Sequence, residues 1–219
     1  MGQLPPVAAV LVIVLLVVSL GIHEAAHGWV ALKCGDTTAR DLGRITLNPI
    51  PHIDPFFTII LPAMLLISNA GIVFGGAKPV PVNFYNLRRP YRDMALVALA
   101  GPAANFLLAI LFYFVFRAVL KLELYTQDQL LPVIMSHAVY FNLLLAAFNL
   151  LPIPPLDGAR VMTWLLPSNL REPYIRLERF GLLLVFGLLY LGVLRGPLVS
   201  TLNFLYDAVH FVVSLGGIW

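Results

Sequence analysis

The stretch "VAAVLVIVLLVVSLGIHEAAH", Val7 to His27, decides the fold class of this 219-residue chain. It begins as an uncharged apolar run of the kind that crosses a bilayer as a helix, yet it ends with two histidines and a glutamate. Counted from Val7, His23 lies about 24 Å along such a helix, just inside the far face of a ~30 Å hydrocarbon core. Ionisable side chains are costly at that depth and usually serve a function. The stretch therefore predicts a transmembrane helix with a functional site near one membrane face.

The composition extends this prediction to the whole chain. Hydrophobic residues make up 60% of it, charged residues 11%, and the mean hydropathy is +0.88. Further uncharged runs begin near Ala95, Leu131, Phe180 and Leu198, and a shorter one spans Phe56 to Phe74. Helices satisfy their own backbone in lipid. We therefore expect an all-α integral membrane protein of five to six transmembrane helices.

Charge and cysteine content exclude several other classes. The net charge of +3 and the pI of about 9.2 come from basic residues between the apolar runs, as membrane topology requires, so no nucleic-acid partner is expected. Cys34 is the single cysteine and cannot form an intrachain disulfide or a redox pair. The first apolar run lacks a basic leading segment and an A-x-A-like cleavage site, so we expect it to be retained rather than removed as a signal peptide.

His23, Glu24 and His27 form an H-E-x-x-H motif. Histidines four residues apart share one face of a helix and can bind one metal ion, while the glutamate can activate a water at that metal. The chain's own residue frequencies give only about 0.002 chance occurrences of this spacing, which makes accident a weak explanation. The motif predicts a catalytic metal site.

Such a site normally has three protein ligands, so a third one must come from elsewhere. Asp157 in "FNLLPIPPLDGAR" is the leading candidate, because prolines interrupt the helix before it and Gly158 permits a tight turn. Its alternative role is the N-cap of a helix that begins near Ala159. His52 is a ligand, a substrate contact or neither, and His137 and His210 are expected to be structural or interfacial.

These segments resemble the site-2 protease family of intramembrane zinc metalloproteases. "HEAAH" matches its first motif and "NLLPIPPLDG" its second, and "LAGPAANFLLA", Leu99 to Ala109, is similar to its G-P-x-x-N segment. "LNPIPHIDP" and "GGAKPVPVN" resemble segments of its compact bacterial members. The likeness runs from about Val7 to Trp164, and no insertion in the sequence resembles a PDZ or CBS domain.

The resemblance implies a role for each motif residue. His23, His27 and Asp157 bind one zinc ion per chain, and Glu24 is the general base. Asn149 positions the substrate or stabilises the oxyanion, although polar side chains in bundles also bond neighbouring helices. Asn105 lies among Gly101, Pro102 and two alanines, which favours a helix-packing role instead.

The two motifs reach one membrane face only if the segment Phe56 to Phe74 does not cross. Pro62 and "SNAG", Ser68 to Gly71, interrupt it, so we expect it to re-enter on the side from which it came. Six full crossings split the 14 basic residues 8 to 6, whereas five crossings split them 11 to 3, with Arg117, Lys121 and Arg195 on the minority side. Basic residues gather in the cytoplasm. This favours an active site near the cytoplasmic face, in a bacterial plasma membrane.

The sequence thus predicts one polytopic protease domain over residues 1–219, with a catalytic core at about 7–164 and a C-terminal helical pair at about 174–216. Its substrate is expected to be a transmembrane protein or peptide, and short strand-like loops at "RITL" and "KPVPV" are expected to pair with it. The alternative is a non-enzymatic metal transporter or metal-binding membrane protein, which needs no general base. The sequence leaves the oligomeric state open.

Overall fold

The computed structural model describes residues 6–60, 64 and 75–216, and every regular element in these ranges is a helix. Four of these helices are long and apolar enough to cross a membrane: α1 (Pro6–Lys33), α4 (Pro90–Lys121), α5 (Leu130–Asn149) and α9 (Arg195–Leu215). The expectation of an all-α integral membrane protein is confirmed. The expected fifth and sixth transmembrane helices are not confirmed by the described residues.

The two remaining apolar runs account for that difference. The run from Phe180 forms α8 (Gly181–Tyr190), and ten helical residues reach about 15 Å, half of the hydrocarbon core. Gly192, with φ +71°, lies in the turn that separates α8 from α9. Of Phe56 to Phe74, only the short π-helical turn η2 (Pro55–Ile60) and residue 64 are described. The predicted re-entrant path therefore lies outside the described residues.

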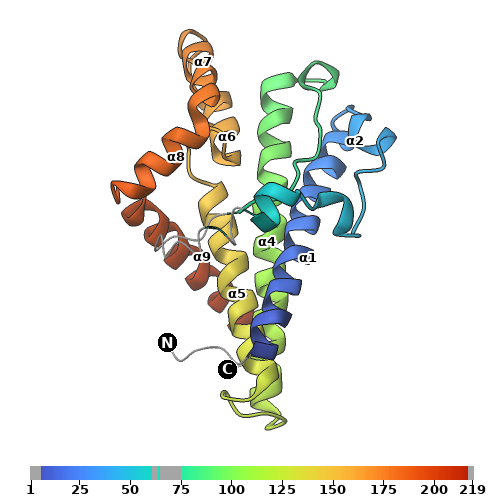
Figure 1. Cartoon of the computed structure of the whole chain (residues 1–219), viewed down its shortest axis with the longest axis vertical. Helices are drawn as coiled ribbons and strands as arrows, with labels where there is room; N and C mark the ends of the chain where they lie inside the picture. Colours follow the sequence, from blue (N-terminus) through green and yellow to red (C-terminus); the bar gives the residue numbers. More distant parts are fainter. Residues whose placement is uncertain (1–5, 61–63, 65–74, 217–219) are drawn as a thin grey trace.

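The helices α1, α4 and α5 lie side by side and alternate in direction (Figure 1). Small buried residues on α4, among them Ala95, Ala98 and Ala109, let the neighbouring helices approach closely. The C-terminal end of α1, the N-terminal end of α4 and the C-terminal end of α5 consequently lie at one end of the bundle (Figure 1). We call this the site end.

The outer helices cover two different parts of this bundle. Val209 and Val213 of α9 pack against Tyr113 of α4 and Leu143 of α5, toward the opposite end. Val185 of α8 belongs to another buried cluster, formed with Leu151, Leu156 and Leu194. The helix α8 therefore packs against the segment that follows α5.

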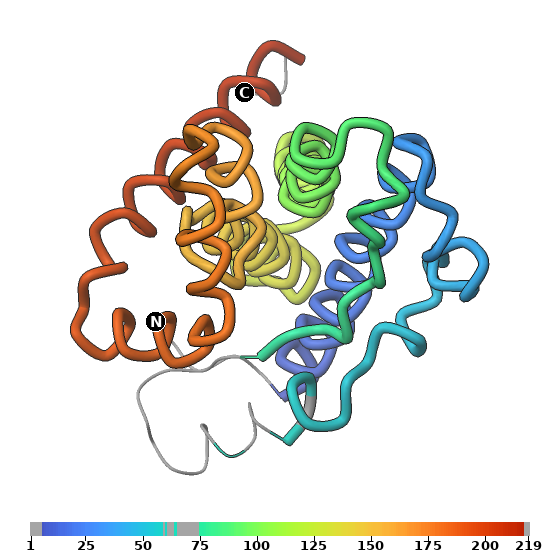
Figure 2. Tube along the Cα trace, turned by 90° about the horizontal axis from the view of Figure 1, so that it is seen from above, coloured from blue at the N-terminus to red at the C-terminus, as the bar shows by residue number. Residues whose placement is uncertain are grey.

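Two connections of short helices close the site end. The first contains α2 (Thr38–Asp41), η1 (Ile50–His52) and η3 (Phe84–Asn86), and the second contains α6 (Asp157–Leu165), α7 (Ser168–Ile175) and η4 (Arg176–Phe180). Figure 2 shows the two connections on opposite sides of the start of α4. Residues 75–83 of the first connection have no regular structure and run along α1.

The expected strand-like loops are not strands. Arg44 of "RITL" reaches the "KPVPV" segment only through its side chain, which donates to the carbonyl of Lys78 at 2.8 Å. Pro79 and Pro81 have no N–H, so this segment cannot build a regular hydrogen-bonded ladder.

Asp36, just after the end of α1, is fully buried and joins the beginning and the end of the first connection. Its carboxylate accepts from the N–H of Asn83 at 2.7 Å, from the side-chain amide of Asn86 at 3.0 Å, and from the N–H and hydroxyl of Thr38. Burial raises the pKa of the Asp36 carboxyl, but these bonds outweigh burial and hold the pKa below its usual value. The Asp36 carboxylate is therefore ionised at neutral pH, and its bond to Asn83 fixes the end of segment 75–83.

Candidate active site

Three potential metal ligands meet at the site end. His23 and His27 extend from one face of α1, and Asp157 begins α6. Asp157 Oδ2 lies 3.3 Å from Nε2 of His23 and 3.4 Å from Nε2 of His27, and the two nitrogens are 3.0 Å apart. The structure thus joins the two motifs, which are 130 positions apart in the sequence.

This triangle fits zinc. Ligands at about 2.0–2.1 Å from a tetrahedral ion stand about 3.3 Å from one another, close to the three distances observed. Asp157 Oδ2 is buried and has no hydrogen-bond partner, which is costly unless a cation occupies the centre. An ionised Asp157 would add one anionic ligand to the two neutral imidazoles.

The segment before Asp157 explains its position. The N-cap of α6 is Leu156, and no side chain caps the helix, so the carboxylate of Asp157 points to the imidazoles instead of serving as the N-cap. A Cβ on Gly158 would collide with the backbone carbonyls of Leu150 and Leu151. Only glycine permits the start of α6 to approach the end of α5 this closely.

Both histidines are oriented by bonds to their second nitrogen. Nδ1 of His23 donates to the Asn105 side-chain oxygen at 2.5 Å, and Nδ1 of His27 donates to the Val97 carbonyl at 2.6 Å. Because these oxygens only accept, the protons lie on Nδ1 and the Nε2 lone pairs face the centre. Such partners fix the tautomer and raise the basicity of a metal ligand.

Asn105 belongs to a buried polar chain that links three helices. Its amide donates to Asn142 Oδ1 on α5 at 2.9 Å, and the Asn142 amide donates to Ser19 on α1 at 3.1 Å. All three side chains are at most 1% exposed. The Asn142 amide also donates to the Ala138 carbonyl at 2.9 Å, so Asn142 Oδ1 faces the Asn105 amide and the Asn105 oxygen is left to face His23.

The G-P-x-x-N segment serves the site at three positions. A Cβ on Gly101 would lie 2.5 Å from Nε2 of both His23 and His27, so glycine leaves the space in which they converge. Pro102 has no N–H to donate to the carbonyl of Ala98, which neighbours the Val97 carbonyl that His27 uses. Asn105 supports His23. The sequence favoured a helix-packing role for Asn105. The G-P-x-x-N motif was the sequence signal that could have indicated its role at the site.

Glu24 lines a cavity of about 230 Å³ beside the triangle. Its Oε2 accepts from the N–H of Val80 at 2.8 Å, and no second partner of this carboxylate is found in the described part of the chain. Val80 therefore orients Glu24 while Oε1 stays available. The role of segment 75–83 in orienting Glu24 was not predicted.

The remaining candidate residues lie outside the triangle, and one of them, Asn149, lines the cavity beside it. Asn149 lines the same cavity, with its amide bonded to the Leu145 carbonyl of its own helix at 3.0 Å. His52 is buried outside the triangle, and its Nε2 bonds the carbonyl of Thr46. His137 bonds its own helix, and His210 lies beside Tyr113.

Replacing Asn105 by leucine is expected to lower zinc affinity about 10- to 100-fold, because His23 loses the acceptor that fixes its tautomer. Competition against a chromophoric chelator measures this affinity. Asn203→Leu, at an exposed position of α9, is the matched control and should bind zinc as the wild type does. Unchanged affinity in a folded Asn105→Leu variant would show that the bond to His23 is dispensable.

Comparison with known proteins identifies the class that this architecture represents. The sequence model of peptidase family M50 matches residues 11–130 and 124–192. "Putative zinc metalloprotease YwhC" of Bacillus subtilis is 40% identical over 184 residues, covering 81% of this chain and 78% of the relative. "Putative zinc metalloprotease Rip2" of Mycolicibacterium smegmatis is 31% identical over 215 residues, covering 95% of this chain and 78% of the relative. No solved structure matches significantly.

The fold and the site define a helical membrane protein with an H-E-x-x-H motif completed by a distant aspartate. The chain belongs to peptidase family M50, the site-2 protease family that its motifs resemble.

Proposed function

We propose that this protein hydrolyses peptide bonds in or near transmembrane segments of its substrates, as an intramembrane zinc metalloprotease. The observation that carries the proposal is the convergence of His23, His27 and Asp157 beside Glu24 within a bundle of membrane-spanning helices. Membership of peptidase family M50 supports it. A metal transporter has less support, because the described residues contain this one metal-ligating cluster and nothing that extends it into a path.

In this proposal His23, His27 and Asp157 hold one zinc ion per chain. When bound, zinc acts as a Lewis acid that lowers the pKa of water and polarises the scissile carbonyl. The Nδ1 bonds of both histidines and the charge of Asp157 keep the donor atoms directed to the centre.

Glu24 is the general base. Its free Oε1 accepts a proton from the attacking water and passes it to the leaving amine, while the Val80 N–H holds Oε2 in place. The Asn149 amide lines the same cavity and can exchange its Leu145 partner for the developing oxyanion. A contact of this type contributes roughly 3 to 4 kcal/mol in other enzymes.

The membrane placement follows from charge. If α1, α4, α5 and α9 cross and the segment 56–74 re-enters, eleven of the 14 basic residues lie at the site end, and Arg117 and Lys121 lie at the opposite end. Arg195, which the five-crossing reading put opposite, begins α9 after the half-span helix α8 and lies partway across the bundle. Excess basic residues mark the cytoplasm, so the active site faces it, in a bacterial plasma membrane.

Residues 1–219 form one protease domain in this arrangement, with the core at 7–164 and the helical pair at 174–216.

Cysteines at positions 88 and 171, introduced after replacement of Cys34, are expected to react with an impermeant thiol reagent from the same side of the membrane. The stacking of Arg171 on the Tyr91 ring at 4.7 Å brings α7 to the start of α4 and supports this result. A cysteine at position 123, between α4 and α5, is the control and should react from the opposite side. Opposite accessibility of positions 88 and 171 would contradict the proposed topology.

The function is tested by incubating the zinc-loaded protein in liposomes with a panel of transmembrane substrates. Mass spectrometry should locate cleavage in or next to the membrane segment. Zinc uptake into the liposomes without any cleavage would contradict the proposal and favour the transporter.

A further inference from the structure

A second cavity, of about 540 Å³, adjoins the cavity beside Glu24, and we call it the side cavity. The two cavities share four lining residues: Val82, Met94, Pro155 and Arg160. The two cavities therefore lie next to each other at the site end.

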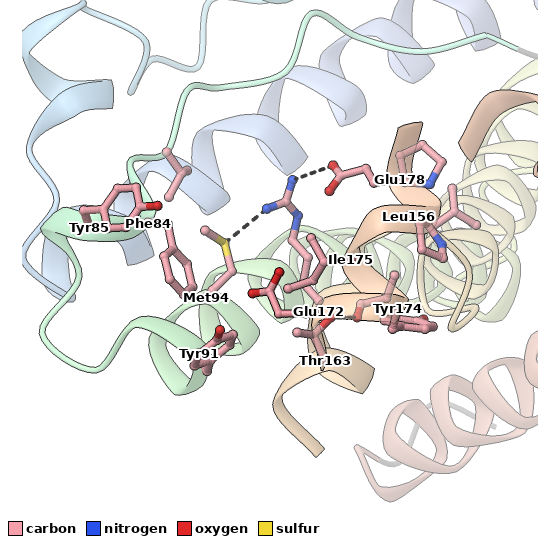
Figure 3. A pocket seen from close by; sticks show the side chains of 15 residues that line it. Phe84, Tyr85, Tyr91, Met94, Leu156, Thr163, Glu172, Tyr174, Ile175 and Glu178 are labelled. Atoms are coloured by element: carbon pink, nitrogen blue, oxygen red, sulfur yellow. Dashed lines mark hydrogen bonds and ion pairs between the residues drawn. The ribbon is translucent and has the colours of Figure 1, made fainter. Parts of the chain in front are cut away.

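The side cavity has two aromatic and apolar walls (Figure 3). One comes from η3 and the start of α4, with Phe84, Tyr85 and Tyr91. The other comes from the loop before α6 and from α7, with Leu156, Tyr174 and Ile175. Such walls suit an apolar or aromatic side chain of an extended peptide.

The charges in the side cavity are unbalanced. Glu172 and Glu178 line it, against the single cation Arg160. Arg160 lies 3.6 Å from Glu178, and its other nitrogen contacts the Met94 sulfur at 3.4 Å. Glu172 has no ion pair within the described residues. Among the residues that line it, the side cavity thus carries one more negative than positive charge, although the Arg171 guanidinium stacks on the Tyr91 ring of its wall.

We propose that the side cavity is a specificity site for the substrate segment that extends from the scissile bond toward the site end. It binds an apolar or aromatic residue between its walls and a nearby lysine or arginine at Glu172 and Glu178. This inference rests on the proposed protease function.

Charge complementarity selects this occupant. Transmembrane proteins carry lysine and arginine in the residues just outside the cytoplasmic face, which is the face proposed for the site. Such a residue competes with Arg160 for Glu178 and gives Glu172 a partner. A lipid tail cannot form an ion pair or a hydrogen bond with the two carboxylates, and they would repel an anionic headgroup.

The test uses three transmembrane substrates that differ at one flanking position, with lysine, glutamine or glutamate on the site-end side of the cleavage point. The zinc-loaded wild type is expected to cleave the lysine substrate at least about fivefold faster than the glutamine substrate in kcat/KM, and the glutamate substrate slowest, as two partly exposed ion pairs allow. The Glu172→Gln, Glu178→Gln variant should lose this preference, and Glu172→Lys, Glu178→Lys should reverse it. Glu123→Gln, remote from the cavity, should keep it.

Binding supplies a readout separate from catalysis. The affinity of the same peptides for the Glu24→Gln variant, followed by fluorescence polarisation, should show the same order and the same loss in the double variant. Equal kcat/KM for the three substrates in the active wild type would overturn the inference alone and would point to a lipid or another occupant. No cleavage of any substrate by the zinc-loaded wild type would instead remove the proposed function, and this inference with it.

Discussion

The His27→Ala, Asp157→Ala double variant is expected to lose its zinc, retaining less than about a tenth of an ion per chain where the wild type retains one. The two changes remove two of three proposed ligands, and even loss of an outer-shell partner weakens metal sites 10- to 100-fold. The remaining imidazole of His23 cannot hold the ion alone. Elemental analysis of purified protein, after dialysis against a weak chelator, measures the zinc content.

His137→Ala is the matched control, because among the described residues His137 bonds a carbonyl of its own helix and lies outside the triangle. It should keep full zinc occupancy. Full occupancy in a double variant whose helical content and melting temperature match those of the wild type would place the zinc elsewhere.

Glu24→Gln is expected to lower the rate of substrate cleavage at least ~10²-fold while zinc stays bound. The amide has the shape of the carboxylate, and its oxygen can still accept from the Val80 N–H, but it cannot take a proton from water. Cleavage rates and zinc content measured on one purified sample separate a loss of catalysis from a loss of metal.

The control for this variant is again Glu123→Gln, which makes the same chemical change between α4 and α5, far from the cavity. It should cleave as the wild type does. Near-normal proteolysis by zinc-loaded Glu24→Gln would show that another group is the base.

The long helices and the first site residues could be predicted because their signals are local. An uncharged run long enough to span lipid admits one backbone solution, and the spacing of His23 and His27 fixes their common face. The proline-interrupted segment before Asp157 indicated a break that could hold a carboxylate. The structure brings these residues together, and their catalytic roles remain proposals.

Other features depend on tertiary context that sequence patterns do not carry. The apolar run from Phe180 matches a span in composition, yet it ends after ten residues at a turn that contains Gly192. The bond from Asn105 to His23 joins α4 to α1. A role of Asn105 in helix packing alone predicts the same burial of its side chain, so the sequence pattern does not distinguish the two roles. The bond from Val80 to Glu24 depends on the path of residues 75–83, which have no periodicity.

Restoring zinc to the stripped wild type tests the central claim most directly. The purified protein is freed of metal by a strong chelator, reconstituted in liposomes with a cleavable transmembrane substrate, and given zinc in fractional steps. Cleavage and bound metal are measured on each sample. Proteolysis is predicted to be absent without metal, to rise in proportion to bound zinc, and to level off at one ion per chain. Proteolysis that persists in the metal-free protein, or zinc binding that never restores cleavage, would contradict a zinc site built from His23, His27 and Asp157 as the centre of catalysis.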